Sequence, residues 1–491
     1  MKILKIQPIL LRLCSYLFLT SLIGAIGLTQ LNGINPIIHS ARAQSQAPRQ
    51  VYMPIVRNGA SWVNPIGVET NVHIDPSASI YPYLDTLNPG YVRMNRRISW
   101  RQLQPYPNQA PDWNQLSDLE AELQTLGNLG ARPILIVDDY PLWATTLPIS
   151  CSAIKPEYYD EFAAFVGELV TRYGTWVKDW ELGNEVDVDP HLIDPNSVYG
   201  CWGDISDLEY YGGRAYGEMI KVVSPVIKSI DPAARVWHAG MFLKHPETLN
   251  PAYGKPENFL RGVLTAGAGP YIDVLAIHAH SLYYGGVRDP YISPANPWTP
   301  WGGGMRGKAN FARSIMAEYG VDKPIMINEI TIGCINTDPY CDPPGPEFYA
   351  FQADMSIRQA VRAVSKDLMG IIWYTLEGPG WRSGGLLNGQ DQPKPTFQAL
   401  LTLSQAIKNT TYIDAENYSS TSLEGYRFER SDGKLVDVIW AVNDTSERIR
   451  VPKARFIRAL DRTGNAVTPL DAGADYQLPV GFSPILVESL P

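Results

Sequence analysis

Short apolar runs alternate with longer helical patterns through most of this chain, and this alternation limits the folds open to it. The runs are nearly continuous in apolar residues, as strands buried on both faces are. Strands that alternate with helices form parallel sheets with right-handed crossovers. Eight such repeats over roughly 345 residues predict an α/β chain folded as a (β/α)8 TIM barrel. The eight runs are Ile66–Thr70, Tyr91–Asn95, Pro133–Val137, Val177–Leu182, Arg235–Ala239, Val274–His278, Ile325–Asn328 and Gly370–Tyr374.

The patterns between the runs repeat apolar residues at helical spacing, and two of them end in Gly130 and Gly174. A glycine directly after a periodic run is a helix stop signal. An open doubly wound sheet is the alternative architecture. That fold usually carries a glycine-rich loop after its first strand, whereas the sequence here is GVETNVHID, which favours the barrel.

The first 43 residues resemble a secretory signal peptide. Basic residues precede a 14-residue apolar stretch, SYLFLTSLIGAIGL, and a small-x-small site follows at Ala41 to Ala43. An uncleaved anchor is the alternative, although the stretch is shorter than the ~20 residues that a spanning helix needs. We therefore expect export to the cell envelope or the extracellular space. Residues 44–60 then form a polar lead-in to a barrel over 61–408.

The net charge limits which classes of partner the protein can bind. Residues 1–43 hold four basic and no acidic residues, so their removal takes the formal net charge from −9 to −13. Nucleic acids and anionic membrane surfaces both require clustered Lys and Arg, and the chain has no basic stripe. We therefore expect neither as a partner, and the sequence leaves the oligomeric state open.

The residue pattern changes after about residue 410. Apolar and polar residues alternate there, and SDGK marks a hairpin turn. This pattern predicts a small β-sandwich over residues 409–491. No binding motif stands out in it, so both a packing partner for the barrel and a carbohydrate-binding module stay open.

Four cysteines remain after the signal segment, and an even set in an exported chain favours disulfides. Metal sites usually need closely paired ligands, and these cysteines lack that spacing. Cys334 and Cys341 share the loop after the seventh run, while Cys151 and Cys201 follow the third and fourth runs. We therefore predict the bridges Cys334–Cys341 and Cys151–Cys201, with four free thiols as the alternative.

Two glutamates follow strands of the predicted barrel. Asn184-Glu185 comes after the fourth run, and Glu329 directly follows the seventh. Active sites of such barrels lie at the carboxyl ends of the strands, so both carboxylates should share one mouth. A pair of this kind suits glycoside hydrolysis, in which one protonated acid helps the leaving group and one ionised carboxylate attacks.

On these motifs the chain resembles glycoside hydrolase clan A, retaining (β/α)8 enzymes with an acid/base Glu after strand four and a nucleophile Glu on strand seven. GNE and INEI carry the likeness, with RMNRRISW near strand two and IIWYTLEGPGW at strand eight. The resemblance implies that Glu185 is the acid/base and Glu329 the nucleophile. Asn184 would bind the sugar 2-hydroxyl.

The resemblance also implies supporting residues. Arg93 would keep Glu329 ionised, and Trp373 would floor the sugar. His278 lies where the clan often has His. The clan usually places a Tyr two residues later, but this chain has His280, with Tyr283 and Tyr284 beyond, so the partner of the nucleophile stays open.

Plainer explanations accompany several of these residues. Arg93 could form a structural ion pair, His278 could be a core histidine and Trp373 could belong to the barrel core. Asp138-Asp139 ends the third run and either touches substrate or lies in a solvated loop. Top-face tryptophans could stack on sugars or simply pack: Trp143, Trp202, Trp298, Trp301 and Trp381.

The leading function is therefore a retaining O-glycosidase, with a silent sugar-binding barrel and a transglycosylase as alternatives. The sugar stays open, because the chain resembles arabinofuranosidase and heparanase-type, xylosidase and iduronidase, and cellulase-type families. No metal or organic cofactor is implied. A retaining pair predicts carboxyl groups ~5–5.5 Å apart. Glycosylation sequons stand at Asn409, Asn417 and Asn443.

Overall fold

The structure is a computed structural model that describes residues 64–192, 201–283, 289–291, 293–335, 341–416, 418, 420–442 and 445–491. All of these residues belong to one compact unit, 52–491. The predicted signal segment 1–43, the lead-in 44–60, Tyr284 and the sequons at Asn417 and Asn443 lie outside the described residues. None of the helices described is long and apolar enough to cross a bilayer.

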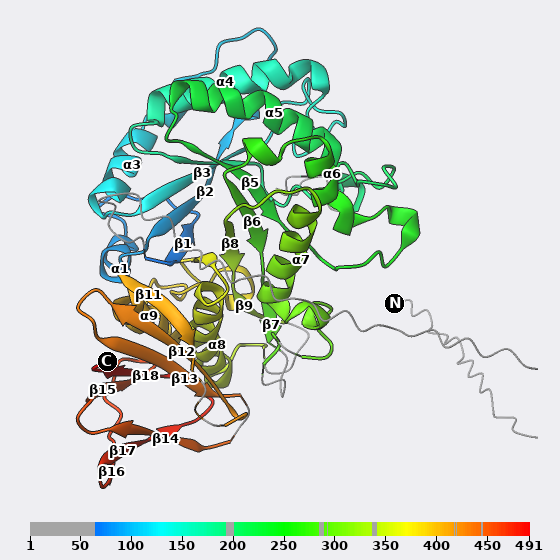
Figure 1. The fold of residues 1–491 in the computed structure, drawn as a ribbon. Helices are drawn as coiled ribbons and strands as arrows, with labels where there is room; N and C mark the ends of the chain where they lie inside the picture. Colours follow the sequence, from blue (N-terminus) through cyan, green and yellow to red (C-terminus); the bar gives the residue numbers. More distant parts are fainter. Residues whose placement is uncertain are drawn as a thin grey trace, which may run out of the picture. The chain divides into compact units, whose positions relative to one another are not determined.

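Eight parallel strands close into a barrel, which confirms the predicted fold (Figure 1). Their order around the barrel is β1-β10-β8-β6-β5-β4-β3-β2, so there is no open edge as in a doubly wound sheet. Each predicted run overlaps one strand. The largest difference in bounds is in β2, which continues four residues further than expected. The strands are β1 Ile66–Thr70, β2 Tyr91–Ser99, β3 Arg132–Asp138, β4 Asp179–Leu182, β5 Arg235–Met241, β6 Val274–His278, β8 Ile325–Ile330 and β10 Leu368–Trp373.

Helices surround the barrel and bury their apolar faces against it (Figure 1). In α4, acidic residues Asp160 and Glu161 lie in the first turn and Arg172 in the last, which complements the helix dipole. Gly174 follows α4 as the predicted stop. The helices are α1 Tyr81–Leu87, α2 Trp100–Leu103, α3 Leu119–Asn128, α4 Tyr159–Tyr173, α5 Gly213–Ile230, α6 Phe259–Thr265, α7 Gly304–Glu318, α8 Pro346–Val364 and α9 Pro395–Ile407.

Two antiparallel sheets follow α9 and form the predicted sandwich. Ile439 and Val487 of the larger sheet pack against Ile449 and Leu478 of the smaller one. The larger sheet has the order β11-β12-β13-β18-β15: Thr410–Ala415, Leu423–Arg430, Leu435–Ala441, Ile485–Ser489 and Phe456–Asp461. The smaller has the order β14-β17-β16: Glu447–Pro452, Asp475–Val480 and Leu470–Ala472.

The other face of the larger sheet packs on the barrel layer. Phe428, Val438 and Trp440 belong to the same buried cluster as the barrel helices. Two arginines of α8 join the sheet: Arg358 donates to the carbonyl of Ala441 at 3.0 Å, and Arg362 Nη2 to Glu424 Oε2 at 2.6 Å. These contacts make the sheet a packing partner of the barrel, which is one of the two roles that the sequence left open.

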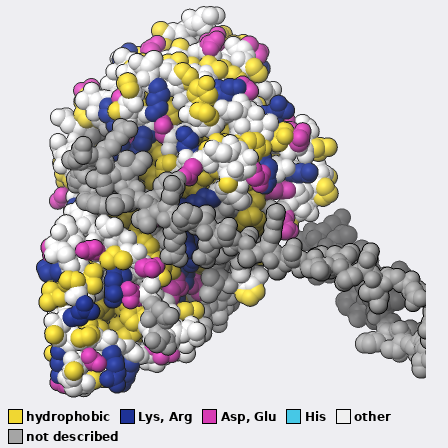
Figure 2. All heavy atoms as spheres, in the orientation of Figure 1, with side chains coloured by type: hydrophobic (Ala, Val, Ile, Leu, Met, Phe, Trp, Pro, Cys, Tyr) yellow, Lys and Arg dark blue, Asp and Glu magenta, His cyan; other side chains and the backbone are white. Residues whose placement is uncertain are grey.

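Both disulfide predictions are confirmed. Cys151–Cys201 joins the loops after β3 and β4, and Cys334–Cys341 closes the loop after β9, Ile332–Cys334. The Cα atoms are 5.2 and 5.4 Å apart, within the usual range for disulfides. On the face drawn in Figure 2, basic and acidic side chains are interspersed.

Candidate active site

The turn after β4 presents the first predicted carboxylate. Gly183 has φ +102°, and a Cβ there would lie 2.9 Å from Val186, so the turn requires glycine. Glu185 itself has φ 47°, a left-handed conformation that non-glycine residues adopt at a cost. Glu185 is buried, and its Oε1 lies 3.0 Å from Nδ1 of His278.

The end of β8 presents the second carboxylate, Glu329, which is also buried. Its Oε1 accepts a hydrogen bond from Arg93 Nη1 and lies 3.4 Å from His278 Nε2, while its Oε2 lies 3.2 Å from His280 Nε2. Burial alone would raise the pKa of Glu329. His278, Arg93 and His280 outweigh burial and lower that pKa well below its ordinary value. Glu329 is therefore ionised at neutral pH.

One imidazole touches both carboxylates. His278, at the end of β6, is fully buried, with Nδ1 toward Glu185 and Nε2 toward Glu329. Gly240 of β5 makes room for the ring, because a Cβ at this position would lie 2.0 Å from His278 Nε2. The alternative of a plain core histidine therefore does not describe its surroundings.

Arg93 lies in a layer of buried charge beneath Glu329. Besides Glu329, its guanidinium donates to Glu69 Oε2 at 2.6 Å and to both oxygens of Glu181 at 2.7 and 3.0 Å. It also donates to Asn184 Oδ1 at 2.7 Å. Arg93 thus forms structural ion pairs with Glu69 and Glu181 and also contacts the nucleophile candidate, Glu329. The structural interpretation of Arg93 and the catalytic one are therefore compatible.

Sequence reasoning missed Glu69 and Glu181. Glu181 also accepts from Asn328 Nδ2 at 2.7 Å and from the Gly240 N–H at 3.0 Å, so donors surround it. The side chain of Glu69 has only Arg93 as hydrogen-bond partner among the described residues. Burial and the neighbouring Glu329 raise the pKa of Glu69 well above its ordinary value. The available signal was a glutamate inside each of two apolar runs.

Of the open alternatives that the structure describes, His280 and Tyr283, it is His280 that meets Glu329. Tyr283 instead packs on Phe348 and Phe351, with ring centroids 5.5 and 5.0 Å away. Its strand, β7 Ser281–Tyr283, pairs with β9. The sequence did not show this extra strand pairing.

Aromatic rings flank His280. The ring of Tyr374 lies 5.7 Å away and that of Trp381 5.4 Å away, and Trp381 is exposed. Trp373 is fully buried and donates Nε1–H to the carbonyl of Gly384 at 2.8 Å, which supports the core alternative for that residue. Trp381, one of the top-face tryptophans, is therefore the better placed ring for stacking on a sugar.

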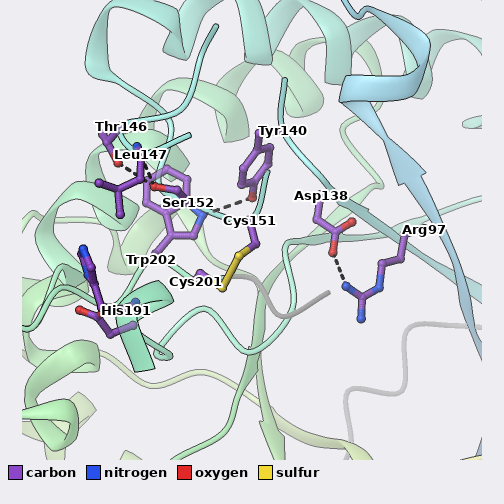
Figure 3. The surroundings of a disulfide bond; sticks show 11 residues. Arg97, Asp138, Tyr140, Thr146, Leu147, Cys151, Ser152, His191, Cys201 and Trp202 are labelled. Atoms are coloured by element: carbon purple, nitrogen blue, oxygen red, sulfur yellow. Dashed lines mark hydrogen bonds and ion pairs between the residues drawn. A yellow bond between two sulfur atoms is a disulfide. The ribbon is translucent and has the colours of Figure 1, made fainter. Parts of the chain in front are cut away.

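Asp138 ends β3 and is buried rather than solvated. Arg97 Nη1 donates to its Oδ2 at 2.9 Å, and Figure 3 shows this pair beside the Cys151–Cys201 bridge. The same figure shows Trp202 directed at Tyr140, with Nε1 3.3 Å from the hydroxyl. Trp202 is buried, so packing explains it.

Within the described residues, His278, His280 and Glu329 are spaced as three metal ligands could be, all within 4.8 Å of one another. Arg93 already donates to the carboxylate of Glu329, and Nδ1 of His278 is paired with Glu185. The arrangement is instead suited to acid/base and nucleophilic chemistry by two carboxylates in unlike surroundings.

Comparison with known proteins shows the fold. Neither a protein-family model nor a curated protein sequence matches this chain. A family 39 glycoside hydrolase from the gut symbiont Bacteroides cellulosilyticus WH2 superposes with a TM-score of 0.62 at 17% identity, over 87% of this chain and 81% of that one.

Two further structures are similar. A GH30 endoxylanase from Clostridium papyrosolvens C71 gives a TM-score of 0.58 at 13% identity, over 88% of this chain and 98% of that one. A GH39 beta-xylosidase from Caulobacter crescentus gives 0.56 at 18% identity, over 89% and 98%. The barrel with its appended sandwich is therefore a fold that this chain shares with glycoside hydrolases.

Proposed function

We propose that the chain is an exported retaining glycoside hydrolase that uses Glu185 and Glu329 in a double displacement. The observation that carries the proposal is the joint contact of both buried carboxylates with His278 at the carboxyl end of the barrel. The shared fold of the GH39 and GH30 structures adds support.

The surroundings of each carboxylate suggest its role. Glu329 attacks the anomeric carbon, because Arg93, His278 and His280 hold it ionised. Glu185 protonates the departing oxygen and then activates the water that releases the sugar. Asn184 binds a sugar hydroxyl, while Arg93 donates a hydrogen bond to the side-chain oxygen Oδ1 of Asn184. A carbohydrate of the cell's surroundings is the expected substrate.

Kinetics on aryl glycosides test these roles. Glu329→Ala should abolish turnover of every substrate, whereas Glu185→Ala should mainly slow substrates with poor leaving groups, because a good leaving group needs little protonation. Near-normal rates for Glu329→Ala on an activated aryl glycoside would contradict the assignment.

The stereochemistry is a second test. A retaining pair separated by ~5–5.5 Å gives a first product with the anomeric configuration of the substrate, which NMR detects at early times. An inverted first product would refute the double displacement. Added acceptor sugars distinguish hydrolysis from transglycosylation.

A further inference from the structure

A line of hydrogen-bonded polar side chains follows one side of the barrel, from the end of β3 to the loop after β10. Arg97 donates to Asp138 Oδ2 at 2.9 Å and to Asn95 Oδ1 at 3.0 Å. Asn95 donates to Asn71 Oδ1 at 2.6 Å, and Asn71 Nδ2 donates to Glu377 Oε1 at 2.7 Å. We name these five residues the polar wall. It follows the neighbouring strands β3, β2, β1 and β10.

Each end of the polar wall is a carboxylate with an oxygen that has no hydrogen-bond partner among the described residues. These atoms are Oδ1 of Asp138 and Oε2 of Glu377, and both are buried. Asp138 as a whole is 3% exposed. Buried polar atoms are nearly always paired, so two unpaired acceptors at the carboxyl-terminal side of neighbouring barrel strands point to donors supplied by a ligand.

The polar wall adjoins the catalytic pair. Asn95 and Arg97 follow Arg93 along β2 toward its carboxyl end, where a bulge between Met94 and Ile98 interrupts the regular alternation of side chains. Tyr374 connects the two regions, because its ring centroid lies 5.7 Å from that of His280 and Glu377 follows it by three residues. A sugar held at Glu329 would therefore lie against the polar wall.

The charge of the polar wall disfavours an anionic ligand. The polar wall holds two carboxyl groups and one guanidinium, which is already bonded to Asp138 and Asn95. Burial raises the pKa of Asp138 to about 6 and raises that of Glu377 above its ordinary value. Negative charge is thus already costly here, and a second anion would add to that cost, whereas a hydroxyl donor would relieve it.

We propose that the polar wall binds the hydroxyl groups of a neutral sugar and rejects uronic acid residues. The proposal rests on the glycosidase function and narrows it. Among the substrate classes left open by the sequence, it favours neutral glycosides such as xylosides, arabinofuranosides or glucosides over the uronides that iduronidase or heparanase-type enzymes cleave.

Matched pairs of aryl glycosides test this selectivity, each pair differing only in a hydroxymethyl group or a carboxylate on the sugar. Glucoside with glucuronide and galactoside with galacturonide are two such pairs. We expect the neutral member of any pair that is cleaved to have at least about tenfold higher kcat/KM. An equal or higher kcat/KM for the uronide would overturn the proposal.

Near-isosteric variants test the residues. Asp138→Asn and Glu377→Gln should each lower kcat/KM on the neutral sugar by about 10–100-fold, the range for a lost hydrogen bond to a charged group. The uronide should lose less or gain, because a repelling charge is removed. The ratio of the two kcat/KM values should therefore fall. An equal loss on both substrates would indicate a structural defect and contradict the proposal.

Asp118→Asn is the matched control. Asp118 pairs with Arg96, the neighbour of Arg97, at 2.8 Å, but its side chain is 49% exposed and lies outside the polar wall. Its kcat/KM ratio should stay that of the wild type. A ratio that fell as far as in Asp138→Asn would point to general electrostatics and refute the specific contact.

Calorimetric binding to the full chain carrying Glu329→Gln separates this proposal from the glycosidase function. Neutral oligosaccharides should bind at least about tenfold more tightly than oligosaccharides of the corresponding uronic acids. If wild-type protein cleaves nothing but this difference appears, the hydrolase function fails and the subsite stands. If cleavage occurs but uronates bind equally or more tightly, the subsite proposal fails alone.

Discussion

Gly240→Ala tests the position of the His278 imidazole, which touches both Glu185 and Glu329. The added Cβ would lie 2.0 Å from Nε2 and 2.5 Å from Cδ2 of His278, and 2.9 Å from Oδ1 of Asn328. Unbonded heavy atoms normally stay about 3.5–4.0 Å apart. The strand cannot simply retreat, because the Gly240 N–H donates to Glu181 Oε1 within the closed barrel. His278 must therefore move by more than about 1 Å.

This displacement should reduce catalysis more than stability. Overpacking a core of this kind costs about 1–3 kcal/mol of unfolding free energy. A misplacement of about 1 Å in a catalytic site can cost about 100-fold in rate. We expect kcat/KM on an aryl glycoside to fall by about that factor in Gly240→Ala, while urea denaturation shows a folded protein.

A double-mutant cycle with His278→Ala identifies the cause. Without the imidazole the alanine methyl group has space, so Gly240→Ala should cost about 1–2 kcal/mol less in that background. Gly127→Ala in α3 is the control, because a Cβ there meets nothing within 4 Å. Gly240→Ala with activity within about twofold of wild type, or without coupling to His278, would refute the reasoning.

Two further variants test stability. Arg362→Met should lower the unfolding free energy by about 3–5 kcal/mol in urea denaturation, because it removes the guanidinium that donates to buried Asp289 and half-buried Glu424; a loss below about 1 kcal/mol would contradict this. Burial lowers the pKa of Lys394 to about 7, so the unfolded chain binds more protons between about pH 7 and 10 and wild-type stability rises with pH there. Lys394→Met should therefore be more stable than wild type at pH 7, and this advantage should shrink as the pH approaches 10; an advantage independent of pH would refute the linkage.

The barrel could be predicted from the sequence because its signal is local. Each apolar run needs only its own residues to be recognised as a buried strand, and both catalytic candidates follow runs directly. The disulfide pairs could be predicted for the same reason, since strand order places their loops on one face. The fold and the two glutamates therefore depended on short stretches of chain.

The charge layer and the polar wall could not be predicted, because both depend on register between strands. Glu69 and Glu181 look like exceptions inside apolar runs until the pairing of Glu69 with Arg93 brings them beneath Glu329. Trp373 illustrates the converse. The family resemblance implied that it floors the sugar, whereas in the structure it is fully buried and its Nε1–H donates to the carbonyl of Gly384. Orientation of a side chain at a strand end depends on neighbours that are distant in sequence.

The larger C-terminal sheet has a bearing on how this chain can evolve. Phe428, Val438 and Trp440 belong to the same buried cluster as the barrel layer. Recombination that separated the sheet from α8 would leave apolar side chains in water on both fragments. Such a sheet cannot be exchanged between enzymes as a detachable cassette. Its sequence and that of α8 must change together. The barrel and the sheet should therefore be inherited as a single module.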